Sequence, residues 1–111
     1  MTKITQASKV FESNIRLQMV ASLSEGDLTY RQLKEICACS DGNMATHTKK
    51  LIERGYVEVK KEFVHNKPQT TYILTAFGRE EYISYLTICK ELYDKVIENE
   101  ETTLDMSLSN G

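Results

Sequence analysis

The chain has 111 residues and a formal net charge of -2, and 41% of its residues are hydrophobic. This length predicts a single domain with a small hydrophobic core. The sequence contains no apolar run long enough to cross a bilayer and no signal-peptide stretch at its start, so we expect a cytoplasmic protein that does not enter a membrane.

Positive charge is concentrated in the middle of the chain. Residues 30–69 carry eight Lys and Arg against five Asp and Glu, whereas residues 70–111 carry three against eight. Residues 1–29 are balanced, with three of each sign. A polyanion would therefore be attracted to the middle segment alone.

The first predicted element is an amphipathic helix at residues 8–23. Its apolar residues recur at the spacing of one helix face, at Phe11, Ile15, Met19 and Leu23. The turn-forming sequence SEGD follows and ends the helix.

A second, shorter helix is predicted at residues 30–37, with Leu33 and Ile36 buried. Thr29 and Gln32 have the spacing of a capping box, in which the hydroxyl of the first accepts from the amide of the second. The side chain of Gln32 then reaches back to the backbone of Thr29, so the helix has a defined start.

A third helix is predicted from a cap at Ser40 to Arg54, ended by Gly55 in the left-handed conformation. Its packing face carries Met44, Thr48 and Leu51, and its opposite face carries Gly42, Asn43, Thr46, Lys49, Lys50 and Glu53. A helix that enters a DNA groove needs amide and hydroxyl groups near its start and cations farther along. The second face offers both, and two short helices in this order indicate a helix-turn-helix.

After Gly55 the pattern has a period of two. Residues 56–64 read as a strand with Val57, Val59, Lys61 and Phe63 on one face. Residues 65–69 are a polar turn that holds the only proline, and residues 70–74 are the returning strand. The hairpin offers donors for phosphate and for an adjacent minor groove, and these donors are Lys60, Lys61, His65, Asn66, Lys67 and Gln69.

The last predicted helix occupies residues 75–97. Spacings of three and four place Tyr82, Tyr85, Cys89, Leu92 and Val96 in one seam. Because a small domain cannot cover so long an apolar helix, we expect a second copy of the chain to cover it. The predicted domain therefore ends at residue 97, and residues 98–111 are expected to form an acidic, disordered tail.

Several stretches of the sequence together resemble one group of regulators. They are Leu33-Lys34, Ser40-Asp41-Gly42-Asn43-Met44, His47-Thr48-Lys49-Lys50-Leu51, Arg54-Gly55-Tyr56-Val57, Thr71-Tyr72-Ile73-Leu74-Thr75 and Gly78-Arg79. In this order the chain resembles the winged-helix regulators of the MarR/ArsR-like group, in particular a short winged-helix DNA-binding subgroup. The resemblance covers about residues 10–86. It implies an α+β, mainly α fold: a winged helix-turn-helix with a two-stranded β-hairpin wing and a long C-terminal dimerisation helix.

The resemblance also implies that the helices at residues 8–23 and 75–97 form the dimer, and that Gly42, Asn43, Ala45, Thr46, Lys49 and Lys50 meet DNA. Two residues depart from the pattern. Ala45 stands where the pattern has Ser, which removes a hydroxyl donor at the groove. Thr48 stands where it has Leu, which thins the packing under the helix.

We therefore predict a sequence-specific DNA-binding transcriptional regulator, a repressor that acts as a homodimer on a palindromic operator in double-stranded DNA. No enzymatic motif, cofactor or metal site is expected. The predicted DNA-binding residues are Gly42, Asn43, Ala45, Thr46, Lys49, Lys50, Arg54, Lys60, Lys61, His65, Asn66, Lys67 and Gln69. The predicted dimer interface consists of Phe11, Ile15, Tyr82, Tyr85, Leu86, Cys89, Leu92, Tyr93 and Val96.

Two alternatives remain open on the sequence alone. Winged helices also serve as protein-interaction adaptors, because a fold does not fix a function. The string from Glu35 to Cys39 resembles one found in metal-sensing relatives, so Cys37 and Cys39 could sense a metal or a thiol reagent, with His47 or Cys89 completing a site. The structural alternatives are two small, reduced core cysteines and a histidine hydrogen-bonded to the neighbouring helix.

Overall fold

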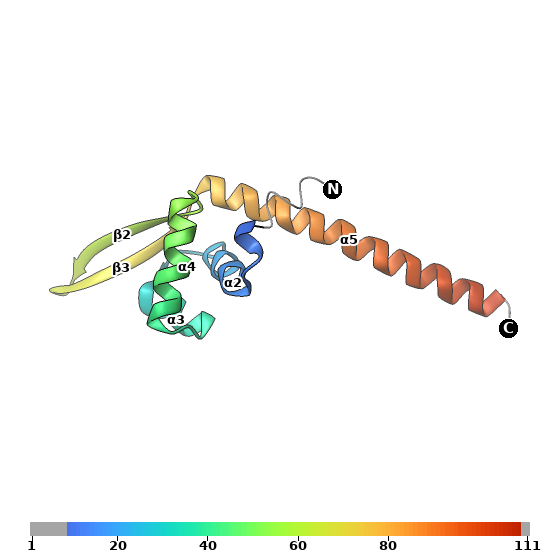
Figure 1. The fold of residues 1–111 in the computed structure, drawn as a ribbon, viewed down its shortest axis with the longest axis horizontal. Helices are drawn as coiled ribbons and strands as arrows, with labels where there is room; N and C mark the ends of the chain where they lie inside the picture. Colours follow the sequence, from blue (N-terminus) through green and yellow to red (C-terminus); the bar gives the residue numbers. More distant parts are fainter. Residues whose placement is uncertain (1–8, 110–111) are drawn as a thin grey trace.

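The computed structural model describes residues 9–109, and it describes side chains for residues 9–101. The elements are α2 (Asn14–Leu23), β1 (Leu28–Thr29), α3 (Tyr30–Cys37), α4 (Asp41–Glu53), β2 (Val57–Val64), β3 (Lys67–Leu74) and α5 (Ala76–Ser109). Helices α2, α3 and α4 lie together, and the β2–β3 hairpin and α5 project from them in opposite directions (Figure 1). This arrangement confirms the predicted winged helix-turn-helix with a long C-terminal helix.

The helix α2 begins later than predicted. A turn at residues 12–13 interrupts the expected helix over 8–23, and Ser13 caps α2, with its Oγ accepting from the backbone N–H of Arg16 at 3.3 Å. The reason is local, because a serine that can bind the first free N–H group of a helix favours a start at that point. Phe11, which precedes the turn, is still buried, with 4% of its surface exposed.

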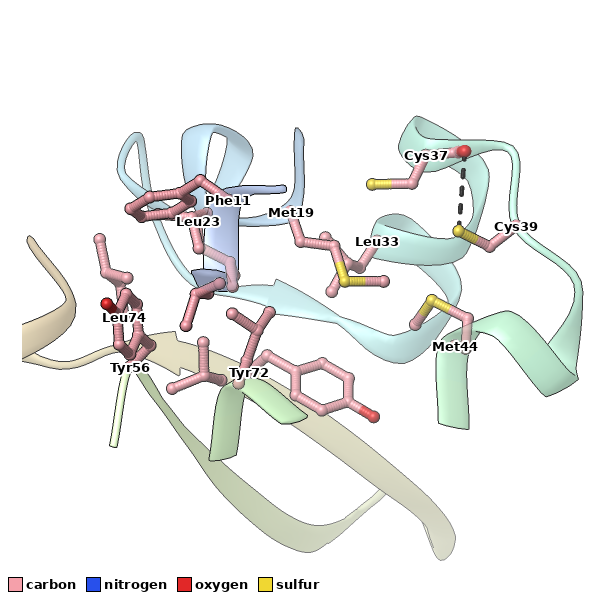
Figure 2. Close-up of a cluster of buried hydrophobic side chains, with 14 residues drawn as sticks. Phe11, Met19, Leu23, Leu33, Cys37, Cys39, Met44, Tyr56, Tyr72 and Leu74 are labelled. Carbon is pink, nitrogen blue, oxygen red and sulfur yellow. Dashed lines mark hydrogen bonds between the residues drawn. The ribbon is translucent and has the colours of Figure 1, made fainter. Parts of the chain in front are cut away.

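The hydrophobic core forms where α2, α3 and α4 meet above the sheet. Its fully buried side chains are Met19, Val20, Leu23, Leu33, Met44 and Leu51, and Figure 2 shows most of the cluster. The expectation that Ile36 is buried is wrong, since 47% of its surface is exposed. In a helix this short, Leu33 and Cys37 stand one turn apart on the inner face, and Ile36 is rotated away from them.

The turn between α3 and α4 is fixed by hydrogen bonds to both helix ends. Ala38 is left-handed at φ 50, and the N–H of Cys39 donates to the carbonyl of Lys34 at 3.1 Å. Ser40 caps α4 by accepting from the N–H of Asn43 at 3.1 Å. The predicted caps of both helices, including the Thr29–Gln32 capping box, are confirmed.

The sheet has three antiparallel strands in the order β1-β3-β2, and the short strand β1 was not predicted. Val64 pairs with Lys67, so the turn consists of His65 and Asn66 alone, at φ 52 and 64. The expected turn over 65–69 is therefore too long. Pro68 lies inside β3 at a position paired with Phe63. Hydrogen-bonded and non-hydrogen-bonded pairs alternate along the ladder, and the Val64–Lys67 pair next to the turn is hydrogen-bonded. The Phe63–Pro68 pair is therefore non-hydrogen-bonded, and the position where Pro68 lacks an N–H faces away from β2.

Helix α5 starts against the base of the hairpin. The Oγ1 of Thr75 accepts from the N–H of Gly78 at 2.9 Å, which confirms the predicted cap. The helix does not end near residue 97 but continues to Ser109, so the stretch expected to be a disordered tail is helical as far as that residue. No Gly or Pro interrupts residues 79–109, which leaves no strong stop signal. Within the described part of the chain, no helix is both long enough and apolar enough to cross a membrane.

Candidate nucleic-acid interface

The two faces of α4 are separated as the sequence predicts. Met44, Thr48 and Leu51 are buried, with at most 6% of their surface exposed. The opposite face is exposed throughout, and its residues are Gly42, Asn43, Ala45, Thr46, Lys49 and Lys50. Because the apolar side chains through which α4 packs lie on the inner face, the outer face is free to contact a partner.

The first turn of α4 is held on α3 by one carboxylate. Asp41 accepts from Lys34 Nζ at 2.8 Å and from the hydroxyl of Tyr30 at 2.5 Å. The Lys34 hydrogen bond and, second, the Tyr30 hydrogen bond lower the pKa of Asp41, and the same carboxylate raises the pKa of Tyr30 to about 12. The three side chains hold the first turn of α4 against α3, and the carboxylate of Asp41 neutralises the positive charge of Lys34.

Thr48 replaces a larger apolar residue of the winged-helix pattern and still fits the buried face. Its hydroxyl donates to the carbonyl of Met44 at 2.6 Å, so the polar group is satisfied inside the helix. No buried side-chain nitrogen or oxygen among the described residues is left without a partner. The substitution therefore exchanges apolar volume for a hydrogen bond within α4.

His47 bridges α4 to the neighbouring helix, as its structural interpretation predicted. Its Nδ1 lies 3.3 Å from Nη1 of Arg16, which donates to it. Burial, and after it the positive charge of Arg16, lower the pKa of His47. The imidazole is therefore neutral at physiological pH and acts as an acceptor here.

The predicted wing residues are distributed over both faces of the β2–β3 hairpin. The register places Lys61 on the face of Phe63, and it places Lys60, Lys67 and Gln69 on the other face. The three wing lysines, Lys60, Lys61 and Lys67, are exposed, as are His65 and Asn66 in the turn, whereas Gln69 is half-buried. Phe63, whose surface is 78% exposed, is an aromatic residue beside these donors that the sequence analysis assigned only to a strand face.

Two of the lysines that are predicted to contact phosphate already form ion pairs within the chain. Lys60 lies 3.5 Å from Glu62, and Lys49 lies 4.0 Å from Glu53. Both pairs are solvent-exposed and therefore weak, so a phosphate can replace the carboxylate at little cost. Lys50, Lys61 and Lys67 form no ion pair within residues 9–101.

The cysteine pair belongs to the core. Cys37 and Cys39 are each 8% exposed, and the thiol of Cys39 lies 3.7 Å from the carbonyl of Cys37 (Figure 2). Burial and, second, the neighbouring Cys39 raise the pKa of Cys37 to about 11. Among the described residues no three His, Cys, Asp or Glu side chains come together as metal ligands, so His47 and Cys89 do not complete a site.

The predicted dimer residues differ in exposure: Phe11 is buried, four are half-buried, namely Ile15, Tyr82, Tyr85 and Cys89, and the other four are exposed. Phe11 does not fit an interface, because the chain's own Tyr56, Tyr82 and Tyr85 surround it at ring-centroid distances of 5.7, 6.1 and 4.8 Å. The turn before α2 brings this ring inward. Farther along α5, several predicted residues keep 45% to 63% of their surface exposed, and these are Leu86, Leu92, Tyr93 and Val96.

A family model described as a winged helix DNA-binding domain matches residues 15–93, which include α2 to β3 and the first half of α5. The chain belongs to this winged helix DNA-binding domain family. A relative from Methanocaldococcus jannaschii, of unassigned function, is 34% identical over 79 residues, which are 70% of this chain and 86% of the relative.

Solved structures share the winged-helix fold. A transcriptional regulator homologue from Pyrococcus horikoshii superposes with a TM-score of 0.75 at 24% identity, covering 86% of this chain and 98% of its own. A putative MarR-family regulator from Enterococcus faecalis superposes with a TM-score of 0.75 at 17% identity, covering 91% and 90%. The predicted resemblance to the winged-helix fold of MarR-like regulators is confirmed, and the family is one of winged helix DNA-binding domains.

Proposed function

We propose that this winged-helix protein is a sequence-specific transcriptional repressor that binds a palindromic operator as a homodimer. The observation that carries the proposal is the outer face of α4. It presents the amide of Asn43 and the hydroxyl of Thr46 near the helix start and Lys49 and Lys50 farther along, all exposed. This order suits base edges in a major groove followed by backbone phosphates.

The wing supports the same orientation. The β2–β3 hairpin projects beyond the helices (Figure 1), and it carries Lys61 and Lys67 outside any ion pair within residues 9–101. A cationic hairpin beside a groove-reading helix has phosphates and the adjacent minor groove within its reach. The DNA-facing surface thus consists of the outer face of α4 and the hairpin together.

The proposed dimer rests on the exposed apolar row of α5. Ile83, Leu86, Tyr93 and Val96 each have at least 45% of their surface exposed, although α5 has 34 residues and only its first turns lie against the domain. An apolar helix face of this length is covered most simply by a second copy. Two copies present two α4 helices, which suit half-sites about 34–36 Å apart on one face of the duplex.

Gel shifts with duplexes from the protein's own upstream region test DNA binding. We expect a discrete complex that weakens steeply with salt, and we expect Asn43→Ala to reduce binding to the operator more than to random duplex. Lys95→Ala on α5 is the matched control, because it removes a cation outside the proposed surface. Absence of any salt-sensitive complex would favour a protein-interaction adaptor instead.

Sedimentation equilibrium tests the dimer. Leu86→Glu with Tyr93→Glu should convert a dimer into a monomer, since both charges would be buried at the apolar row. Glu91→Lys, on an exposed position of the same helix, should leave the dimer intact. A wild-type protein that sediments as a monomer at micromolar concentration would overturn this part of the proposal.

A further inference from the structure

A depression beside α4 gathers four cationic side chains from two separate segments. It is lined by Lys9, Arg16, Lys50 and Arg54, with Val10, Thr46 and Glu12 completing the wall. Thr46 and Lys50 on α4 and Arg54 at its C-cap stand one turn apart, so they form one edge of the exposed face. Lys9 and Arg16 come from the chain around the start of α2.

The four cations of the depression outnumber the one carboxylate in its wall, that of Glu12. None of its four cations forms an ion pair within residues 9–101, although Glu12 lines the same wall. Other cations of the same surface, such as Lys34 and Lys49, do have carboxylate partners. Four like charges in one hollow repel one another, and an anion placed among them relieves that repulsion.

Arg16 gives the depression a rigid base. Its Nε donates to the carbonyl of Val10 at 2.7 Å, its Nη2 to the carbonyl of Lys9 at 3.2 Å, and its Nη1 to Nδ1 of His47 at 3.3 Å. All three acceptors are neutral groups, so they hold the guanidinium without cancelling its charge. A guanidinium has more N–H donors than these contacts use, which leaves donors for an incoming oxyanion.

The depression and the wing lie on opposite sides of α4. In Figure 1, α4 lies between the β2–β3 hairpin on one side and α2 on the other, so the depression and the wing flank α4 on opposite sides. A helix in the major groove has a phosphate backbone on each side. The wing reaches toward one of them, and the depression joins the outer face of α4 to the α2 side.

We propose that this depression binds a phosphoryl group, supplied by the DNA strand that flanks α4 on the side opposite to the wing. The proposal rests on the proposed function, and it adds Lys9 and Arg16 to the DNA-facing surface. A free phosphorylated small molecule carries the same oxyanion chemistry, so the experiment separates the two sources.

Salt dependence of DNA binding tests the DNA source. Each phosphate contact contributes about 0.9 to the slope of log K against log salt. Lys9→Gln and Arg54→Gln should each lower that slope by about one contact, which is roughly a threefold smaller loss of affinity between 50 and 200 mM salt. Lys95→Gln should leave the slope unchanged. Both variants remove exposed side chains, so we expect their unfolding temperatures to match that of the wild type.

Titration of the full chain with inorganic phosphate, followed by backbone amide NMR shifts, tests the pocket without DNA. Saturable shifts in residues 9–16 and 46–54 that Arg54→Gln abolishes support a phosphoryl site. If these shifts occur but the two variants keep the wild-type salt slope of DNA binding, the site binds a free ligand. If the variants have a lower salt slope, the site binds the DNA strand. Unchanged slopes together with no saturable shift overturn the proposal. A protein that binds no DNA at all but still shows the phosphate shifts would refute the proposed function and keep the pocket.

Discussion

Arg16 before the middle of α2 and His47 in the middle of α4 form a hydrogen bond in which the imidazole is the acceptor, with 3.3 Å between Nη1 and Nδ1. A protonated imidazole has no lone pair to accept with, and it would face a guanidinium. The bond that joins α2 to α4 therefore exists only while His47 is neutral.

The first prediction follows from the lowered pKa of His47. Since the unfolded chain takes up this proton more readily than the folded chain, stability is lost as the pH falls below the ordinary histidine value of about 6.5 toward the lowered folded value. Thermal unfolding from pH 8 to pH 5 should show this loss, and His47→Gln should reduce it. His65→Gln, at the exposed hairpin turn, is the control. Identical profiles for wild type and His47→Gln would refute the prediction.

The second prediction concerns two glycines with opposite surroundings. A Cβ at Gly78 would lie 2.3 Å from the carbonyl oxygen of Tyr56 and 2.9 Å from its Cα, and backbone atoms cannot move aside. Gly78→Ala should therefore destabilise the protein by about 1–3 kcal/mol or more. A Cβ at Gly42 meets only Ser40 Oγ, at 3.9 Å, so Gly42→Ala should leave stability unchanged or raise it by up to about 1 kcal/mol. Urea unfolding of both variants measures the contrast, and equal losses would contradict it.

The third prediction separates core cysteines from a sensor. Because Cys37 and Cys39 are buried and the pKa of Cys37 is raised to about 11, neither should react with a thiol reagent faster than the protein unfolds. Cys89, which is only partly buried, should react first in the isolated chain. Zinc should leave the rates of Cys37 and Cys39 unchanged. Protection by zinc of a rapidly reacting Cys37 would reinstate the metal-sensing alternative.

The fourth prediction concerns Phe63, whose ring is 78% exposed opposite Pro68 on the hairpin. If the wing contacts DNA, this ring loses water to sugar or base surfaces. Phe63→Ala should then weaken binding roughly fivefold, corresponding to about 1 kcal/mol of apolar burial, with no change in salt slope. Lys67→Ala should lower the slope instead. Unaltered affinity in Phe63→Ala would place the ring outside the interface.

The sequence predicted the elements whose boundaries are decided by neighbouring residues. The Thr29–Gln32 box, the Ser40 cap and the left-handed Gly55, at φ 78, act within a few residues of themselves. The exposed face of α4 followed from helical periodicity in the same way. These features needed no information on what lies across the fold.

Features that depend on distant residues were missed. The strand β1 is two residues long, too short for an alternating pattern, and it exists because Leu28 and Thr29 pair with Tyr72 and Thr71. The approach of Lys9 and Arg16 to α4 is likewise a tertiary contact. Charge counts along the chain could not detect it, because residues 1–29 carry equal numbers of each sign.

The close contact of Gly78 with Tyr56 also determines the direction in which α5 leaves the domain. It anchors the root of α5, a helix of 34 residues that is about 50 Å long at 1.5 Å per residue. Tilting such a rod by about 10° displaces its far end by roughly 9 Å. In two chains paired along their α5 helices, a tilt of this size alters the distance between the two α4 helices without changing any residue of the proposed DNA-facing surface. If the chains pair as proposed, the contact of Gly78 with Tyr56 therefore sets the distance between the two α4 helices.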